Sequence, residues 1–249
     1  MAPPNSGSKY FNYKKTFSVV LMAAVDANYK FIMVDVGAPG RHSDGGIFKT
    51  CAFGKRLGHQ LLDIPGPTKL PKSSRVAPHV FIGDEAFQLR EDFMRPFPGK
   101  HMNSEHRVFN YRLSRARRIV ENAFGILSSR WRILLNRLNL LPHNAEFVVL
   151  AYCILHNFMC ATPEMYVPAG YADYDDEFGN TIPGQWRADE EKSELIELER
   201  TKCKNFSKSA SEARNIFVDY FMQEGSLPWQ WVHAGVQTPA HKQVARHTV

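Results

Sequence analysis

The stretch TFSVVLMAAVDANYKFIMVDVG, residues 16–37, decides the first part of the fold. Two runs rich in Val, Ile, Leu, Met and Phe, residues 17–25 and 31–36, flank the turn-forming residues 26–30. Runs of this composition on either side of a short polar segment are typical of a β-hairpin. We therefore expect two antiparallel strands with Asp26 in the loop that joins them.

Helix and loop signals follow this hairpin. Residues 38–57, APGRHSDGGIFKTCAFGKRL, begin with a Pro-Gly break and then offer Ser43 or Asp44 as the N-cap of a short helix. Residues 63–79 carry four prolines, which predicts a loop.

The longest helical pattern of the chain is centred on FNYRLSRARRIVENAFGILSSRWRIL, residues 109–134. Its apolar residues recur at steps of three and four: Phe109, Leu113, Ala116, Val120, Ala123, Phe124, Leu127, Trp131, Leu134 and Leu138. The stripe fits one long helix or two consecutive helices, with Gly125 and Asn136 as the weak points. A second apolar helix is expected over about residues 145–160. Strands followed by long helices predict a mixed α/β fold.

The composition excludes several classes of protein. Of the 249 residues, 44% are hydrophobic and 12% aromatic, which is enough for a sizeable core. No apolar run reaches the roughly 18 residues of a membrane span, so no membrane association is expected. The start, MAPPNSGSKYF, has no apolar stretch typical of a signal peptide. Four cysteines in a chain of this length do not predict a disulfide framework, which favours a reducing compartment.

Charge is distributed unevenly along the chain, whose net charge is +6. Residues 170–200 hold ten acids and three bases, so the remainder is strongly basic and predicts a polyanionic partner. We divide the chain into a domain over residues 1–160, an acidic linker over 161–200, a C-terminal amphipathic helix over 201–235 and a tail over 236–249 that is expected to be disordered.

Two acids lie where they can bind a metal ion. The apolar run at residues 80–82 predicts a strand that stops at Gly-Asp, and Asp84 is either an ordinary turn residue or a ligand held at the edge of a sheet. Glu121 lies on the flank of the long helix, where it either pairs with Arg117 or Arg118 or stays accessible. Small residues border it: Ser114, Gly125 and Ser128. Carboxylates on a strand end and on a facing helix can together bind a hard divalent cation.

Two other clusters have both a structural and a functional explanation. Cys153, His156 and Cys160 share a helical face, but a structural zinc site takes four ligands, so burial is the favoured explanation. Arginines are frequent between residues 107 and 137 and form either a solvated helix face or a surface for DNA phosphates. Those expected to contact the nucleic-acid backbone are Arg117, Arg118, Arg130 and Arg132.

Four segments occur in a fixed order: VDVGAPGRHSDGGIFKT, VFIGDEAF, FNYRLSRARRIVENAFGILSSRWRIL and AYCILHNFM. Together they resemble the DDE-superfamily endonuclease domain of Harbinger-type transposases and of their domesticated nuclease relatives. The flanking segments NYKKTFSVVLMAAVDANYKFIMVDVG and ARNIFVDYFMQEGSLPWQ are similar to the same family. The resemblance covers residues 5–160 well and extends more loosely to about residue 230.

This resemblance implies an RNase H-like fold, which is a mixed sheet flanked by helices, and three acids that gather Mg²⁺ or Mn²⁺. Asp84 matches the second acid of the family, and Glu121 matches the third. Both are therefore expected to be catalytic residues and metal ligands. The resemblance also implies DNA as the substrate, a Myb-like partner protein, and a nuclear location, with the cytoplasm as a second compartment.

The first acid of the family has no counterpart in these residues. In the family it belongs to an Asp-Gly pair in a strand just before the segment that corresponds to PPNSGS, which here follows directly after Met1 and Ala2. We therefore expect the first strand to be missing and the chain to be N-terminally incomplete. Structural or turn roles are favoured for Asp26, Asp35 and Asp44. Asp44 is the best substitute as a third ligand, because it stands at the terminus of an element.

Three functional interpretations follow. The leading one is a metal-dependent endonuclease or transposase-derived domain that acts on DNA phosphodiesters and is impaired by the absent first acid. The second is a remnant of a domesticated transposase that binds DNA or protein without catalysis. The third, a basic protein that binds RNA or DNA without chemistry, is disfavoured by the order of the four segments.

Overall fold

The computed structural model describes residues 3–4, 6–12, 14–192 and 206–237. The chain divides into two compact units, and each is described by itself. The first unit consists of Met1–Leu62, Arg118–Tyr174 and Thr181–Lys202. The second consists of Asp63–Arg117, Asp175–Asn180 and Cys203–Val249.

The first unit is built on the predicted hairpin. β1 (Val19–Val25) and β2 (Phe31–Pro39) pair antiparallel, with register irregularities near both ends of β1. In the connecting loop, Oδ1 of Asp26 accepts hydrogen bonds from the N–H groups of Asn28, at 2.8 Å, and Lys30, at 2.9 Å. The side chain of Asp26 thus satisfies the loop backbone, and the prediction of a hairpin turn at this residue is confirmed.

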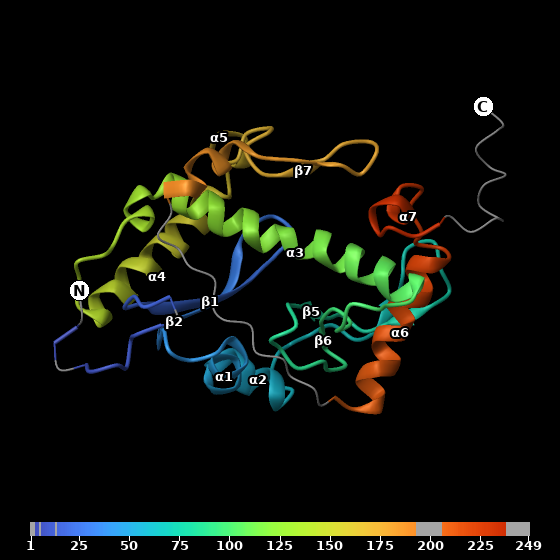
Figure 1. Ribbon diagram of the computed structural model, residues 1–249, viewed down its shortest axis with the longest axis horizontal. Coiled ribbons are helices and arrows are strands. Elements are labelled where there is room, and N and C mark those ends of the chain that lie inside the picture. The colour runs from blue at the N-terminus through green and yellow to red at the C-terminus, as the bar shows by residue number, and fades with distance from the viewer. Residues whose placement is uncertain (1–2, 5, 13, 193–205, 238–249) are drawn as a thin grey trace. The chain divides into compact units, whose positions relative to one another are not determined.

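Helix α4 (Pro142–Met159) packs against β2, and Figure 1 shows it alongside the hairpin. The side-chain amide of Asn157 ties the two elements together. Its Oδ1 accepts from the N–H of Phe31 and its Nδ2 donates to the oxygen of Phe31, each at 2.8 Å. The core beneath this contact consists of Phe31, Ala123, Leu127, Leu134, Val149 and Cys153.

Two short helices, α1 (Asp44–Thr50) and α2 (Ala52–Gly58), contact the strands of the hairpin. Ser43 is the N-cap residue of α1, and Asp44 is the first residue of the helix. An acid in the first turn interacts favourably with the partial positive charge of a helix N-terminus. The predicted helix after the Pro-Gly break is therefore present as two consecutive helices.

Helix α3 (Ser104–Arg130) is a single helix of 27 residues, followed by the 3₁₀ helix η1 (Arg132–Leu135). The division between the two units falls inside it, between Arg117 and Arg118. Gly125 does not break the helix. It is buried, and a Cβ atom there would lie 2.2 Å from the ring of Trp186, so the glycine makes room for an aromatic side chain.

The first unit also contains most of the segment expected to be an acidic linker. It holds α5 (Pro163–Tyr166), the first residue of β7 (Tyr174–Asp175), β8 (Thr181–Ile182) and the 3₁₀ helix η2 (Gln185–Lys192). Its buried residues form a second cluster with α3 and α4: Ile126, Cys160, Tyr166, Ala172 and Trp186. Residues 193–205, the rest of this segment, lie outside the described part of the chain.

The second unit combines four very short strands with helices. β3 (Thr68–Lys69) pairs antiparallel with β4 (Val76–Ala77), and β5 (Phe81–Ile82) pairs parallel with β6 (Phe93–Met94). Its core joins β6 and the first half of α3 to the C-terminal helix α6, and consists of Leu89, Met94, Phe109, Leu113, Ala210, Ala213 and Val218.

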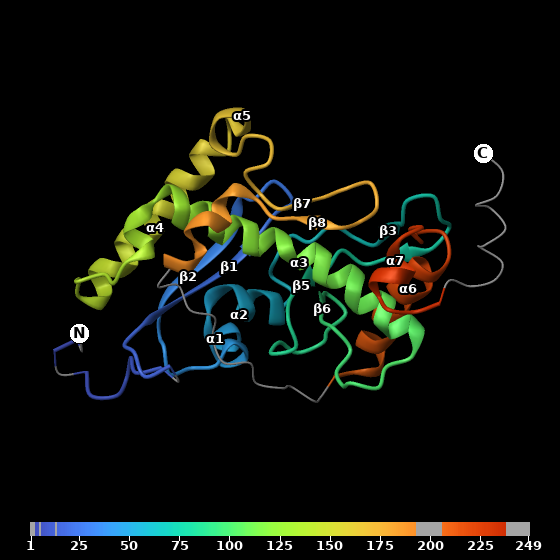
Figure 2. The same ribbon diagram turned by 45° about the horizontal axis from the view of Figure 1, so that its top comes forward.

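Two helices follow the undescribed residues and belong to this second unit. They are α6 (Lys208–Met222) and α7 (Gln230–His233), which lie next to the first turns of α3 in Figure 2. Val108 of α3 packs with Trp231 and Ala234. The mixed α/β content is confirmed, and each sheet among the described residues has two strands. None of the helices in the described part of the chain is long and apolar enough to cross a membrane.

Candidate active site

Asp84 lies just after β5, and close packing allows only glycine at the residue before it, Gly83. The N–H of Gly83 donates to the oxygen of Met94 at 3.0 Å, which extends the parallel pairing by one residue. A Cβ atom on Gly83 would lie 2.7 Å from the ring of Phe93 and 2.8 Å from that of Phe87. The Gly-Asp pair is therefore the result of close packing at the end of a strand.

The side chain of Asp84 is half-buried and begins a turn. Its Oδ1 accepts from the N–H of Ala86 at 2.9 Å, and its main-chain oxygen accepts from the N–H of Phe87 at 3.4 Å. Arg95, which follows β6, donates from Nη1 to the oxygens of Glu85 at 3.1 Å and Phe87 at 3.2 Å. The carboxylate thus stands on a loop that is fixed from two sides, as a metal ligand requires.

Glu121 is exposed on α3, in the first unit. Among the described residues its carboxylate forms no hydrogen bond or ion pair, so the alternative of a surface pair with Arg117 or Arg118 is not observed. The next residue, Asn122, is fully buried and fixes the rotation of the helix. Glu121 consequently faces solvent with both carboxylate oxygens available.

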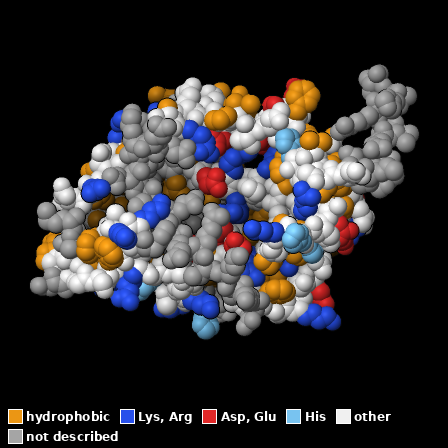
Figure 3. Space-filling model, in the orientation of Figure 1, with side chains coloured by type: hydrophobic (Ala, Val, Ile, Leu, Met, Phe, Trp, Pro, Cys, Tyr) orange, Lys and Arg blue, Asp and Glu red, His pale blue; other side chains and the backbone are white. Residues whose placement is uncertain are grey.

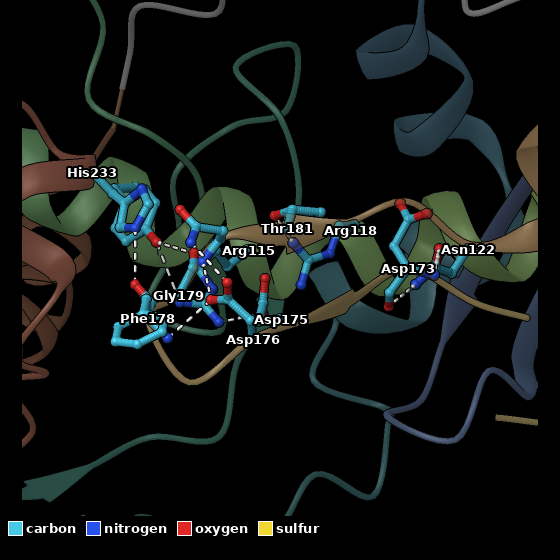
Figure 4. A network of polar contacts seen from close by, with 12 residues as sticks. Arg115, Arg118, Asn122, Asp173, Asp175, Asp176, Phe178, Gly179, Thr181 and His233 are labelled. Atoms are coloured by element: carbon cyan, nitrogen blue, oxygen red, sulfur yellow. Dashed lines mark hydrogen bonds and ion pairs between the residues drawn. The ribbon is translucent and has the colours of Figure 1, made fainter. Parts of the chain in front are cut away.

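Asn122 is a structural residue that the sequence reasoning missed. Its Oδ1 accepts from the N–H of Asp173 at 3.0 Å and from Nε1 of Trp186 at 2.9 Å, while its Nδ2 donates to the oxygen of Asp173 at 3.1 Å. Figure 4 shows the side chain of Asn122 directed at Asp173. A polar residue one step from an apolar stripe was the available signal, because a buried asparagine needs several partners.

Asp173 is a second buried polar residue, held by a guanidinium. Its carboxylate accepts from Nε of Arg187 at 2.9 Å, from Nη2 of Arg187 at 2.6 Å and from the N–H of Gly184 at 2.7 Å. These bonds use both oxygens of the carboxylate. Asp173 is therefore a structural acid of the first unit and not a candidate metal ligand.

The remaining candidate acids lie in the first unit, whereas Asp84 lies in the second. Asp44 begins α1, Asp26 caps the hairpin loop, and Asp35 lies on β2 opposite Met22. The part of the chain that the structure describes contains no group of three or more His, Cys, Asp or Glu side chains placed to hold a metal ion. Asp84 and Glu121 each carry carboxylate oxygens of the kind that Mg²⁺ and Mn²⁺ prefer.

The cluster of Cys153, His156 and Cys160 is buried, as the favoured explanation predicted. Nε2 of His156 lies 2.8 Å from the oxygen of Tyr29, and Nδ1 lies 3.0 Å from the hydroxyl of Tyr166. A carbonyl only accepts, so Nε2 carries the proton and Nδ1 accepts from the tyrosine. Both ring nitrogens are occupied, which excludes a zinc ligand here. Burial raises the pKa of the Cys153 thiol to about 11 and lowers that of His156.

Several arginines of α3 make contacts within their own unit. Nη1 of Arg118 donates to Oγ1 of Thr181, as Figure 4 shows. Nη2 of Arg130 donates to the oxygen of Tyr166 at 2.6 Å, and its guanidinium lies 4.1 Å from the ring centre of Tyr171. These bonds fix the segment after α4 against α3.

Arg112 and Arg115, in the first half of α3, make contacts within the second unit. Arg112 donates to the oxygen of Gly225 at 2.8 Å, and Arg115 pairs with Asp175 while its guanidinium lies 4.0 Å from the ring centre of Trp229.

Arg117, one of the arginines expected to contact DNA, differs from these. It is half-buried and forms no hydrogen bond or ion pair with any described residue. Arg132 is exposed at the start of η1. Figure 3 shows Lys and Arg side chains spread over the face that it draws. Arg117 is therefore better placed to meet a polyanion than Arg130, whose guanidinium already holds a carbonyl.

Residues 1–157 match the model of the DDE superfamily endonuclease family. The chain belongs to this family. The matched residues include Asp44, Asp84 and Glu121, and they exclude α6 and α7.

Two relatives are similar to part of this chain. Protein ALP1-like of Arabidopsis thaliana is 31% identical over 163 residues, which are 62% of this chain and 38% of that protein. Putative nuclease HARBI1 of Mus musculus is 27% identical over 159 residues, which are 63% of this chain and 41% of that protein. The match thus spans about two fifths of each relative. No solved structure matches.

Proposed function

We propose that this DDE superfamily endonuclease domain hydrolyses DNA phosphodiesters with the help of a divalent cation, and that its fold is of the RNase H-like type. The observation that carries the proposal is the placement of Asp84. A glycine that the packing requires, an Asx-type turn and the Arg95 clamp together hold this carboxylate at a strand end.

Asp84 and Glu121 are the proposed metal ligands, and each has carboxylate oxygens of the type that Mg²⁺ or Mn²⁺ prefers. A bound cation supplies a water of lowered pKa and positive charge for the leaving oxygen. The nucleophile is a water molecule or a DNA 3′-hydroxyl. The role of Glu121 is supported by its exposure and by the absence of an ion partner among the described residues.

The affinity for metal is proposed to be low in these 249 residues, because the family's first acid is not among them. Two carboxylates hold a divalent cation less firmly than three, so cleavage is expected to be weak unless Asp44 or a further segment supplies the third ligand. The competing proposal, binding of DNA or of a protein without catalysis, is favoured by one observation. The described residues contain no cluster of three potential ligands.

The partners are proposed on the same basis. Arg117 and Arg132 are candidates for contacts with the DNA backbone, where a guanidinium fork suits a phosphate. Such contacts position the nucleic acid and do not read its sequence. A Myb-like partner and a nuclear location accompany the nuclease proposal, and both are testable by co-purification and by imaging of the tagged chain.

Cleavage of supercoiled plasmid by the purified chain in Mn²⁺ tests the nuclease proposal. Each ligand variant has a matched control that removes another carboxylate from the same loop or helix: Glu85→Gln for Asp84→Asn, and Glu105→Gln for Glu121→Gln. We expect nicking that EDTA abolishes, that both ligand variants lose and that both controls keep. Loss in the Asp44→Asn variant as well would identify the third ligand.

Two results would contradict the nuclease proposal. Cleavage that survives both ligand substitutions has another source. Absence of cleavage, combined with plasmid retardation that Arg117→Met weakens and Lys49→Met does not, would favour the non-catalytic DNA-binding alternative.

A further inference from the structure

The second unit buries two arginines that form no ion pair with any acid of the described residues. Arg95 follows β6 and is 2% exposed, and Arg214 lies on α6 and is 3% exposed. Nε of Arg95 and both Nε and Nη1 of Arg214 are buried without a hydrogen-bond partner among the described residues. Buried arginines are normally paired with a carboxylate or fully hydrogen-bonded, because an uncompensated charge is costly to remove from water.

The surroundings of the two guanidiniums are aromatic and cationic. The guanidinium of Arg214 lies 3.6 Å from the ring centre of Phe97, which also stacks on the ring of His106 with a centroid distance of 3.6 Å. Phe206 spans both arginines, with its ring centre 5.6 Å from the guanidinium of Arg214 and 6.0 Å from that of Arg95. Cation–π contacts of this kind offset part of the free-energy cost of burying the charge, but they do not provide hydrogen-bond acceptors for the N–H groups.

The two charges also act on each other. Burial, together with the positive charge of Arg95, lowers the pKa of Arg214 to about 10. The same positive charge of Arg214, added to burial, lowers the pKa of His106. An anion placed between the guanidiniums would remove this repulsion and occupy the unpaired donors.

We propose that Arg95 and Arg214 form a binding site for a phosphate group, with Phe206 at its entrance. Three buried N–H positions from two planar forks suit a tetrahedral oxyanion with several oxygens better than a carboxylate with two. Phe206 is 42% exposed and its ring lies near both guanidiniums, so the proposal places it on the solvent side of the pair. The phosphate comes from DNA or from free phosphate, and the site stands independently of the nuclease proposal.

The site also has a direct connection to Asp84. Nη1 of Arg95 holds the carbonyl oxygens of Glu85 and Phe87, so the guanidinium that would meet the phosphate is the one that fixes the Asp84 loop. Phosphate bound at Arg95 would therefore stiffen this loop.

Thermal unfolding of the full chain in sodium phosphate, with sodium chloride and sodium acetate at equal ionic strength, tests the site. We expect Tm to rise with phosphate concentration and not with acetate, because a ligand that binds only the folded state stabilises it. Arg214→Met removes the unpaired charge at similar volume, so it is expected to lose the phosphate response without a lower Tm in chloride. Arg214→Lys, which keeps the charge without the fork, should respond more weakly than the native chain.

The matched control is Arg75→Met. Arg75 lies in the same unit but has partners, since its Nε pairs with Glu224 at 3.1 Å and its Nη2 donates to Gln223 at 2.8 Å. This variant should keep the full phosphate response. The proposal is overturned if Arg214→Met responds to phosphate like the native chain, or if acetate raises Tm as much as phosphate does.

The anisotropy of a labelled DNA duplex then assigns the source of the phosphate. If Arg214→Met weakens DNA binding more than Arg75→Met does, the phosphate belongs to DNA. Equal DNA binding by the two variants, with the phosphate response still lost in Arg214→Met, assigns the site to free phosphate.

Discussion

The side-chain amide of Asn122 forms hydrogen bonds with both the N–H and the carbonyl oxygen of Asp173. This pairing mimics the contact between two strands, but it connects a helix to a segment 51 residues further along the chain. It places Trp186 against Gly125 and leaves the adjacent Glu121 exposed. The orientation of the proposed metal ligand is thus a consequence of a structural asparagine.

Replacement of Asn122 by alanine is expected to destabilise the first unit by about 3 kcal/mol, because it leaves buried donors and acceptors without partners at about 1–3 kcal/mol each. Urea unfolding monitored by tryptophan fluorescence measures the change. The matched control is Asn139→Ala, at an exposed position outside the helices, which should change the free energy of unfolding by less than about 0.5 kcal/mol. Equal effects of the two substitutions would contradict the assigned role of Asn122.

Gly125→Ala is expected to be destabilising although alanine is the better helix former. The added Cβ atom would lie 2.2 Å from the ring of Trp186, which must move out of the core. Overpacking of this kind costs about 1–3 kcal/mol. Gly58→Ala, at the end of α2 with nothing within 4 Å of the added atom, should be neutral or slightly stabilising. Differential scanning calorimetry measures the Tm of both variants. A raised Tm for Gly125→Ala would refute the predicted clash with Trp186.

The ion pair between Asp173 and Arg187 should contribute far more than an exposed pair. Asp173→Asn removes the negative charge of a fully buried side chain that accepts from the Arg187 guanidinium, whose side chain is 31% exposed, and is expected to cost about 2 kcal/mol. The exposed pair of Lys208 and Glu212, at 3.7 Å, is the comparison. Glu212→Gln should change the free energy of unfolding by less than about 0.5 kcal/mol. Urea denaturation of the two variants measures both changes in the free energy of unfolding. A change of less than about 0.5 kcal/mol for Asp173→Asn would show that the pair with Arg187 is dispensable.

Stability is expected to fall in mild acid because of His156. Burial lowers the pKa of this histidine in the folded chain, whereas the unfolded chain keeps the ordinary value of about 6.5. Below pH 6.5 the unfolded state therefore binds more protons, so the stabilising contribution is full above that pH and is lost as the pH drops toward the folded pKa.

The measurement is the free energy of unfolding between pH 5 and 8, and two variants serve as controls. His106→Gln removes a second histidine whose pKa is lowered by burial. The free energy of unfolding of this variant should still fall in acid, by most of the amount seen in the native chain. His42→Gln changes an exposed histidine of the first unit and should leave the profile unchanged. A flat profile in the native chain would contradict the assignment.

The sequence predicts the parts of the fold whose periodicity is strong. The hairpin follows from two apolar runs around Asp26, and α3 and α4 follow from apolar residues at steps of three and four. The sequence left open whether α3 is one helix, since Gly125 is unfavourable in a helix interior. Contact with Trp186 outweighs that preference, and this contact is not visible in local composition.

Residues 163–192 were the part least accessible to sequence reasoning. Their many acids, with three prolines, are the composition of a linker. Two of their aromatic residues, Tyr166 and Trp186, are nevertheless buried against partners that are distant in sequence. Asp84 and Glu121 were selected as candidate metal ligands through the order of the family's motifs, and this assignment stays a prediction. Arg95 and Arg214 each have buried N–H groups without a partner among the described residues. This feature depends on packing, which no sequence pattern encodes.

The most direct test of the central claim is the affinity of the chain for Mn²⁺, measured by electron paramagnetic resonance titration of the native chain, Asp84→Asn, Glu121→Gln and the double variant. If both acids ligate the same ion, each single variant should bind Mn²⁺ at least about tenfold more weakly, and the double variant should have lost the site. Glu85→Gln and Glu105→Gln should bind as the native chain does. Affinities within a factor of about two in all four chains would contradict the assignment of Asp84 and Glu121 as metal ligands.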